Sequence, residues 1–110
     1  MKVIYQQAAR DDVIRQFRYY LLTLNLPRVA VRFRTAVSQT IRSLQEHPLV
    51  GPRYRSSNPR FENLRTWAVT GFEAIRIYYQ LDQDTLRVIR ILHGKRDVKG
   101  ILEREGVGGK

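Results

Sequence analysis

The spacing of apolar residues changes shortly after the start of the chain. Residues 2–6 are rich in side chains that favour pleated structure and predict a short opening strand. From Ala8 onward, apolar residues recur at steps of three and four, which is typical of an amphipathic helix. They are Ile14, Phe17, Leu21 and Leu24. We expect Asp11 and Asp12 in the first turn of this helix, where the helix dipole favours acidic side chains.

A break at residues 25–27 separates this helix from a second one. Asn25 is the expected cap of the second helix, and Pro27 suits its first turn because proline lacks the N–H that is unpaired there. The second helix is predicted to continue to about Glu46. Its apolar face contains Ala30, Phe33, Val37, Ile41 and Leu44. Neither helix buries its stripe alone, so we expect a helical hairpin that covers a sheet.

The second half of the chain predicts a loop and three strands. Residues 47–59 are rich in Pro, Gly, Ser and Asn, which disfavour a helix, and the loop and its end carry three arginines. These are Arg53, Arg55 and Arg60. Beyond the loop, three β-like segments cover residues 64–69, 72–81 and 85–92. The links between them are short, which favours antiparallel hairpins.

The middle and last of these strands differ in how apolar residues alternate. In the middle strand, Ile75, Ile77, Tyr79 and Leu81 share one face, and Ala74, Arg76, Tyr78 and Gln80 share the other. One face is expected to pack on the helices while the opposite face carries arginine and tyrosine. Residues 85–92 are apolar on both sides, which favours a central strand with the opening strand beside it. A weaker helical pattern follows at residues 98–104.

These elements predict a two-layer α+β fold with an N-terminal strand, an α-hairpin and a three-stranded antiparallel meander. The whole chain has 110 residues, a common size for one domain. We expect a single domain over residues 1–105 and a flexible tail over 106–110.

The charge balance indicates an anionic partner. The formal net charge is +10, and sixteen of the twenty basic residues are arginine, whose guanidinium group forks onto carboxylates and phosphates. A surface of this sign attracts RNA, DNA or an acidic protein segment, and charge alone does not choose among them. We expect the arginines to form one cationic flank beside the helical hairpin. A basic surface that serves only solubility is the alternative.

Several classes of site are disfavoured by composition. The chain has no cysteine and only two histidines, so we expect no metal and no other cofactor. No basic-then-apolar leader and no long apolar run occur, so a cytoplasmic protein without a membrane partner is expected.

The order of motifs resembles the ParE branch of the RelE/ParE superfamily of type II toxin–antitoxin systems, over nearly the whole chain. The segments that carry the resemblance are His47-Pro48 with Gly51, Asn63-Leu64-Arg65, Gly71-Phe72, Arg76-Ile77-Tyr78-Tyr79, and the run from Arg90 to Asp97. The resemblance implies the same two-layer fold. It also implies a co-encoded ParD-like antitoxin, disordered until bound, in a hetero-oligomeric complex with the toxin.

Resemblance to ParE toxins further implies inhibition of DNA gyrase, with or without its DNA, by binding rather than by catalysis. A binding poison requires complementary shape and charge, which basic side chains near the end of the sheet would supply. The expected target-binding residues are Arg65, Arg76, Arg90, His93, Lys95 and Arg96. For each arginine the alternative is a solvated side chain on a strand face.

RelE-like members of the superfamily are instead ribosome-dependent mRNA endonucleases, and this is the second hypothesis. By resemblance, Arg76 and Arg96 stand where those enzymes place phosphate-facing arginines. However, Phe61 and Asn63 stand in place of lysines, and Leu102 in place of a tyrosine. A phosphate clamp without its acid and base would cut RNA slowly.

His93 would be the proton-transfer group of such a nuclease, together with Arg76 and Arg96 as its catalytic set. We favour a structural role for His93 at the turn that follows the last strand, and a helix-capping role for Asp97. Trp67 and the Tyr78-Tyr79 pair are interpreted as core residues rather than stacking platforms for bases. A third hypothesis is a degenerate, non-toxic relative that only binds a partner.

Overall fold

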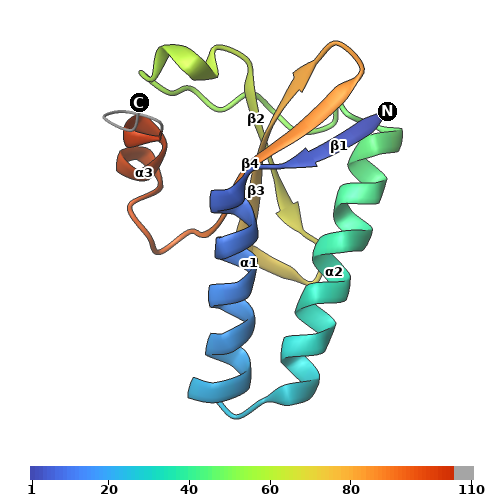
Figure 1. Ribbon diagram of the computed structural model, residues 1–110, viewed down its shortest axis with the longest axis vertical. Helices are drawn as coiled ribbons and strands as arrows, with labels where there is room; N and C mark the ends of the chain where they lie inside the picture. Colours follow the sequence, from blue (N-terminus) through green and yellow to red (C-terminus); the bar gives the residue numbers. More distant parts are fainter. Residues whose placement is uncertain (106–110) are drawn as a thin grey trace.

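Four strands form one mixed sheet in the computed structural model, which describes residues 1–105 (Figure 1). The strands β1 (Lys2–Tyr5), β2 (Leu64–Val69), β3 (Phe72–Asp82) and β4 (Thr85–His93) lie in the order β1-β4-β3-β2. β2, β3 and β4 are antiparallel neighbours, whereas β1 runs parallel to β4. The predicted central position of β4 and the pairing of the opening strand beside it are confirmed. The tail predicted for residues 106–110 lies outside the described residues.

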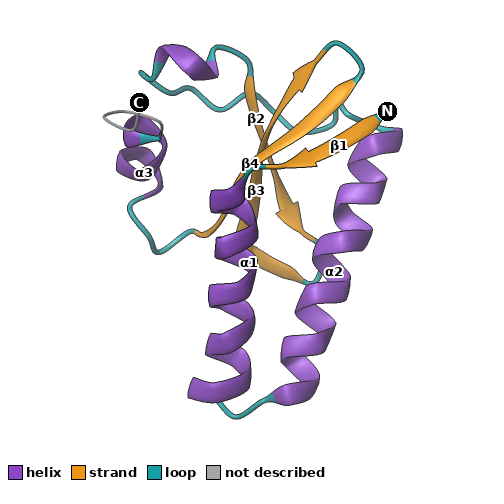
Figure 2. Cartoon of the chain, viewed as in Figure 1, coloured by secondary structure: helices purple, strands orange, loops and turns teal. Residues whose placement is uncertain are grey.

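Two long helices form the predicted hairpin (Figure 2). α1 (Gln7–Arg18) continues into a π-helical segment, η1 (Tyr19–Thr23), and α2 (Pro27–Glu46) follows after a short reversal. Asn25 has a φ of 54° at this reversal, a left-handed conformation that asparagine tolerates better than most residues. Leu26 is the N-cap of α2 and makes no side-chain cap, so the predicted capping by Asn25 is wrong.

The buried face of α1 differs from the predicted stripe. α1 begins at Gln7, so Asp11 and Asp12 lie beyond its first turn, which contains no acidic residue. Ala9 and Asp12 are the buried residues of α1, while Ile14 is 49% exposed and Leu24 is 42% exposed. Leu24 lies at the tip of the hairpin, which extends beyond the sheet in Figure 1. Ile14 is exposed for another reason, because it lies on the outer face of α1 while Val13 and Tyr20 pack against the core.

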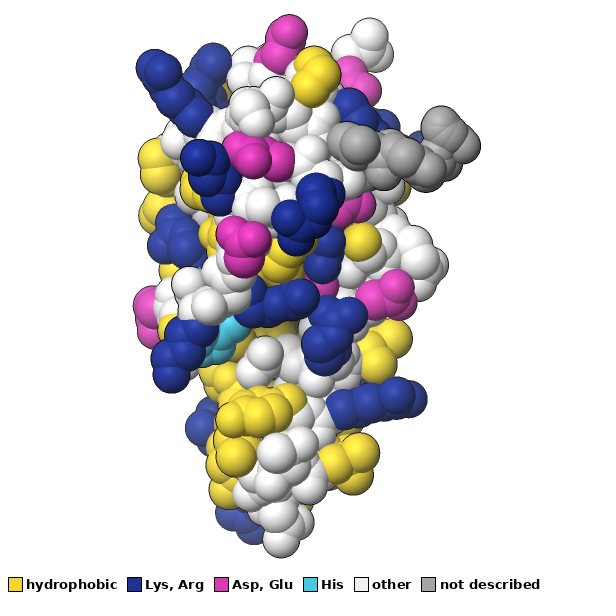
Figure 3. Space-filling model, turned by 90° about the vertical axis from the view of Figure 1, so that its left-hand side faces the viewer, with side chains coloured by type: hydrophobic (Ala, Val, Ile, Leu, Met, Phe, Trp, Pro, Cys, Tyr) yellow, Lys and Arg dark blue, Asp and Glu magenta, His cyan; other side chains and the backbone are white. Residues whose placement is uncertain are grey.

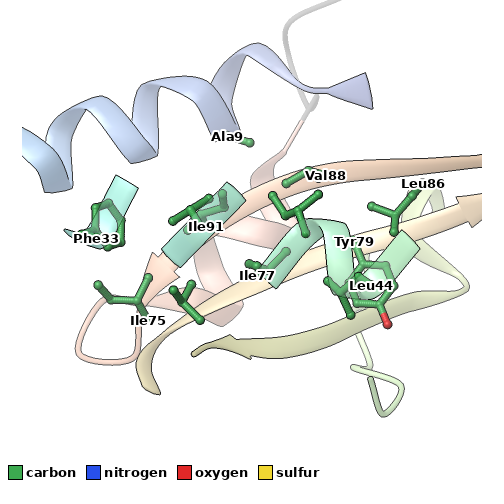
Figure 4. Packing of buried hydrophobic residues seen from close by; sticks show 12 residues of the cluster. Ala9, Phe33, Leu44, Ile75, Ile77, Tyr79, Leu86, Val88 and Ile91 are labelled. Atoms are coloured by element: carbon green, nitrogen blue, oxygen red, sulfur yellow. The ribbon is translucent and has the colours of Figure 1, made fainter. Parts of the chain in front are cut away.

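The main core lies between the helical hairpin and the sheet, with Ala9 of α1 in the same cluster as the α2 residues (Figure 4). The apolar stripe of α2 is buried as predicted, with Phe33, Val37, Ile41 and Leu44 in the core. The sheet contributes Val69, Ile75, Ile77, Tyr79, Leu86, Val88 and Ile91 to the same cluster. Trp67 packs against this cluster, so its interpretation as a core residue is confirmed.

A second, smaller core covers part of the opposite face of the sheet. The short helix η2 (Pro59–Phe61) and the C-terminal helix α3 (Val98–Arg104) provide its cover. Its buried members are Phe61, Leu64, Tyr78, Ile89, Leu92 and Leu102. Tyr78 is therefore a core residue rather than part of an open face, while Arg76 beside it on β3 stays partly exposed.

Candidate functional site

Arg90, expected to be an exposed target contact, is mostly buried in an ion cluster. Its side chain is 13% exposed and that of Asp12 is 1% exposed. Arg90 Nε and Nη2 donate to the two Asp12 oxygens at 2.8 Å each, and Nη1 donates to Glu105 Oε1 at 3.0 Å. The hydrogen bonds to Asp12 raise the pKa of Arg90, although burial acts in the opposite direction. The expectation of an exposed Arg90 is wrong: this side chain ties α1, β4 and the end of α3 together.

The C-terminal helix is held at both ends by side chains. Asp97 Oδ1 accepts a hydrogen bond from the Gly100 N–H at 3.1 Å, which confirms its predicted role as a cap. At the other end, the Asn58 amide donates to the carbonyl oxygens of Leu102 at 3.0 Å and Glu105 at 2.9 Å. α3 is therefore anchored to Arg90 and to residues 53–60, the segment before β2 that we call the 53–60 loop.

Arg65 and Tyr79 anchor the segment that follows α2, which we call the 47–51 turn. The Tyr79 hydroxyl donates to the Pro48 carbonyl at 2.7 Å and accepts from the Gly51 N–H at 3.2 Å. Arg65 Nη1 donates to the carbonyls of Gly51 at 2.7 Å and Leu49 at 3.3 Å. Burial raises the pKa of Tyr79, so its hydroxyl stays protonated as a donor. Arg65 thus contributes to loop structure rather than presenting a free guanidinium group.

Arg76 and His93 lie at the same end of the sheet but on opposite faces. Arg76 is paired with Leu92 and Ile75 with His93, and partners in an antiparallel pair project to the same face. Arg76 Nε donates to Thr66 Oγ1 at 3.1 Å. His93 Nδ1 accepts from the Lys95 N–H at 3.1 Å, which confirms the structural role favoured from the sequence. The structure does not bring Arg76 and His93 together around one point.

Lys95 and Arg96 leave the end of β4 and are exposed. Arg96 also borders an open hollow of about 350 Å³ together with Arg90, Arg104 and Glu105. Because Arg90 is paired with Asp12 and Glu105, the basic border residues available to an anionic partner are Arg96 and Arg104.

The outer side of the hairpin carries an apolar surface that was not predicted from the sequence. A groove of about 490 Å³ runs along α1 and η1, and its apolar lining comes from Ile14, Tyr19 and Leu22. Leu22 is 71% exposed. Arg15 and Arg18 line the same groove, together with Asp11. The signal was present in the sequence, because η1 holds more apolar residues than one buried stripe needs.

Exposed arginines are spread over the molecule rather than gathered on one flank. They occur on α1, on α2, in the 53–60 loop and in the C-terminal segment. In Figure 3, basic side chains are interspersed with acidic ones, and apolar side chains collect toward the end of the molecule that holds the hairpin tip. The single cationic flank expected from the sequence is therefore absent from residues 1–105.

Comparison with known proteins identifies the family. Residues 3–98 match the family described as the ParE toxin of the type II toxin–antitoxin system parDE. The chain belongs to the ParE toxin family. A solved chain described as the chromosomal ParDE system from P. aeruginosa superposes with a TM-score of 0.68 at 17% identity, over 84% of this chain and 95% of that chain. At this identity the superposition supports the ParE-like fold alone. No curated protein matches the sequence.

In this ParE family member, two of the positions at which RelE-like endonucleases are expected to have catalytic residues belong to the core. Phe61 and Leu102 are buried in the second core, and Asn63 is exposed and accepts a hydrogen bond from Arg53 at 3.1 Å. Over residues 1–105, no group of three His, Asp or Glu residues is arranged to hold a metal ion. None of the helices in that range is long and apolar enough to cross a membrane.

Replacing Arg90 by Met tests its structural role. The variant would leave the Asp12 carboxylate buried without its main partner, which costs about 3–5 kcal/mol of the free energy of unfolding. Arg15→Met is the matched control: Arg15 also contacts Asp12, at 3.3 Å, but its side chain is 60% exposed. We expect this control to cost less than about 1 kcal/mol. Urea denaturation measures both, and equal losses would contradict the assignment.

Gly51→Ala tests the close packing beneath the 47–51 turn. An added Cβ would lie 2.6 Å from both the Thr66 carbonyl oxygen and the Tyr79 hydroxyl. We expect a loss of about 1–3 kcal/mol, as for other overpacked sites. At Gly94 the added Cβ would meet only the Ala74 carbonyl oxygen, at 3.5 Å, so Gly94→Ala should be close to neutral. Thermal unfolding measures both variants. Similar unfolding midpoints for Gly51→Ala and Gly94→Ala would contradict close packing beneath the turn.

Proposed function

We propose that the free protein is a binding toxin of DNA gyrase and that a co-encoded ParD-like antitoxin neutralises it. The family match over residues 3–98 supports a toxin of a type II toxin–antitoxin system. Gyrase as the target follows from resemblance to ParE toxins, and it places the site of action in the cytoplasm. A protein that inhibits by binding needs complementary shape and charge but no acid and base of its own.

The separation of Arg76 from His93 is the observation that most supports inhibition by binding rather than by RNA cleavage. Cleavage of RNA beside a 2′-hydroxyl requires a base, an acid and cations around a single phosphate. The strand register puts Arg76 and His93 on different faces of the sheet. Phe61 and Leu102 are core residues at two further positions of that set. These facts favour a binding toxin over a RelE-like mRNA endonuclease that uses Arg76, His93 and Arg96.

We assign target binding to the basic residues that follow the end of β4. Lys95 and Arg96 are exposed, and Arg76 is partly exposed at the same end of the sheet. Arginine is enriched among interface residues that carry much of the binding energy. Arg65 and Arg90, with their side chains bound to the scaffold, act by holding its shape. His93 orders the turn that presents Lys95.

The hairpin surface is where we place the antitoxin. Ile14, Tyr19 and Leu22 form an apolar groove that Arg15 and Arg18 border. An acidic amphipathic segment would bury the apolar residues and pair its carboxylates with the two arginines. The resulting complex is hetero-oligomeric.

A supercoiling assay with purified protein, gyrase and relaxed plasmid tests whether gyrase is the target. We expect loss of supercoiling or trapped DNA cleavage by the wild-type protein. Arg96→Ala should weaken this inhibition about tenfold, the effect typical of an important interface arginine. Arg28→Ala, which removes an exposed arginine at the start of α2, is the matched control and should behave like the wild type.

Two other outcomes would replace this proposal. New codon-dependent mRNA ends in toeprinting of ribosomes, with gyrase unaffected, would indicate a RelE-like endonuclease. Normal growth of cells that express the protein without its antitoxin would indicate a degenerate relative that only binds a partner.

A further inference from the structure

The 47–51 turn presents two adjacent apolar side chains to solvent. Leu49 is 68% exposed and Val50 is 47% exposed. A single exposed leucine is ordinary in a folded protein and needs no explanation. The feature that sets this pair apart is the backbone beneath it, which is fixed from several sides.

Polar groups hold the turn without burying its apolar side chains. The Tyr79 hydroxyl bonds to the backbone of Pro48 and Gly51, and Arg65 bonds to the carbonyls on either side of Val50. The next residue is fixed as well, because the Thr66 N–H donates to the Pro52 carbonyl at 3.1 Å. The turn is therefore rigid, yet Leu49 and Val50 add little to the core.

We propose that Leu49 and Val50 form a preformed apolar contact for the folded protein that this toxin inhibits. Nucleic acid is disfavoured as the partner because its phosphates pair with cations rather than with aliphatic side chains. A rigid turn loses little entropy when it enters a ready-made pocket, whereas a disordered antitoxin segment moulds itself along a groove such as that of α1.

Charge around the turn defines the pocket that it fits. Arg65 is bonded to the backbone of the turn, so the cation presented to a partner is Arg53, which is exposed beside β2 and bonded to Asn63. The complementary surface is an apolar pocket with carboxylates at its rim. This inference rests on the proposed function, since the partner is the target of the free toxin.

The double variant Leu49→Ser/Val50→Ser tests the contact. Both side chains are exposed, so we expect the thermal midpoint to stay near that of the wild type. Inhibition of gyrase and growth arrest should weaken at least about tenfold, as when central contact residues are truncated. Binding to the co-encoded antitoxin should not change. Val31→Ser, which removes an exposed valine from α2, is the matched control and should leave all three readouts unchanged.

Tyr79→Phe tests whether rigidity matters, because it removes only the hydroxyl that anchors the turn. Leu49 and Val50 remain, but the Pro48 carbonyl and the Gly51 N–H on either side of them lose their hydrogen bonds to the hydroxyl. We expect a smaller loss of inhibition than for the double variant, together with faster amide hydrogen exchange over residues 49–51.

Each outcome decides the inference. Full growth arrest by the double variant overturns it, and so does a variant that loses antitoxin binding instead of toxicity. If the wild type arrests growth but leaves gyrase active, the gyrase proposal fails while the growth assay still decides the role of the turn. If the wild type does not arrest growth, both proposals fail.

Discussion

Burial of β4 on both faces is the constraint on which the rest of the structure depends. Its neighbours β1 and β3 pair with both edges, and its apolar side chains project to both sides of the sheet. One face is covered by the helical hairpin, with Ala9 of α1 in the same cluster as Val88 and Ile91, and the other by η2 and α3. The C-terminal segment is therefore part of the scaffold. Arg90 lies in this buried strand, and the cluster it forms with Asp12 and Glu105 lets a charge remain there.

The fold was predictable because its signals are periodic and local. The alternation in β3, the doubly apolar β4 and the helical stripe of α2 each predicted the observed burial. The stripe of α1 failed at Ile14 because the buried face of this helix holds Ala9 and Asp12 and leaves Ile14 on the outer side. Apolar periodicity cannot show that a carboxylate, paired with Arg90, takes a place on the buried face.

The candidate site was harder to predict because a sequence does not show what each arginine contacts. Arg65, Arg90 and Arg96 look alike in the chain, but the first anchors a turn, the second is buried against Asp12 and the third is exposed. Asp12 lies far from Arg90 in sequence, so their pairing depends on the tertiary structure and cannot be read from the local sequence. The faces of Arg76 and His93 were likewise set by register, which the β3–β4 bulge shifts between Tyr78 and Tyr79.

A few buried polar contacts hold the scaffold together, and we propose that separate surfaces of it bind a target and an antitoxin. In this proposal, inhibition comes from binding and not from turnover. Titration of the protein against gyrase at concentrations well above the dissociation constant tests this claim most directly. We predict that inhibition rises in proportion to added protein, stops at a fixed molar ratio and is reversed by the antitoxin. Progressive inactivation by a small fraction of that ratio would contradict the account.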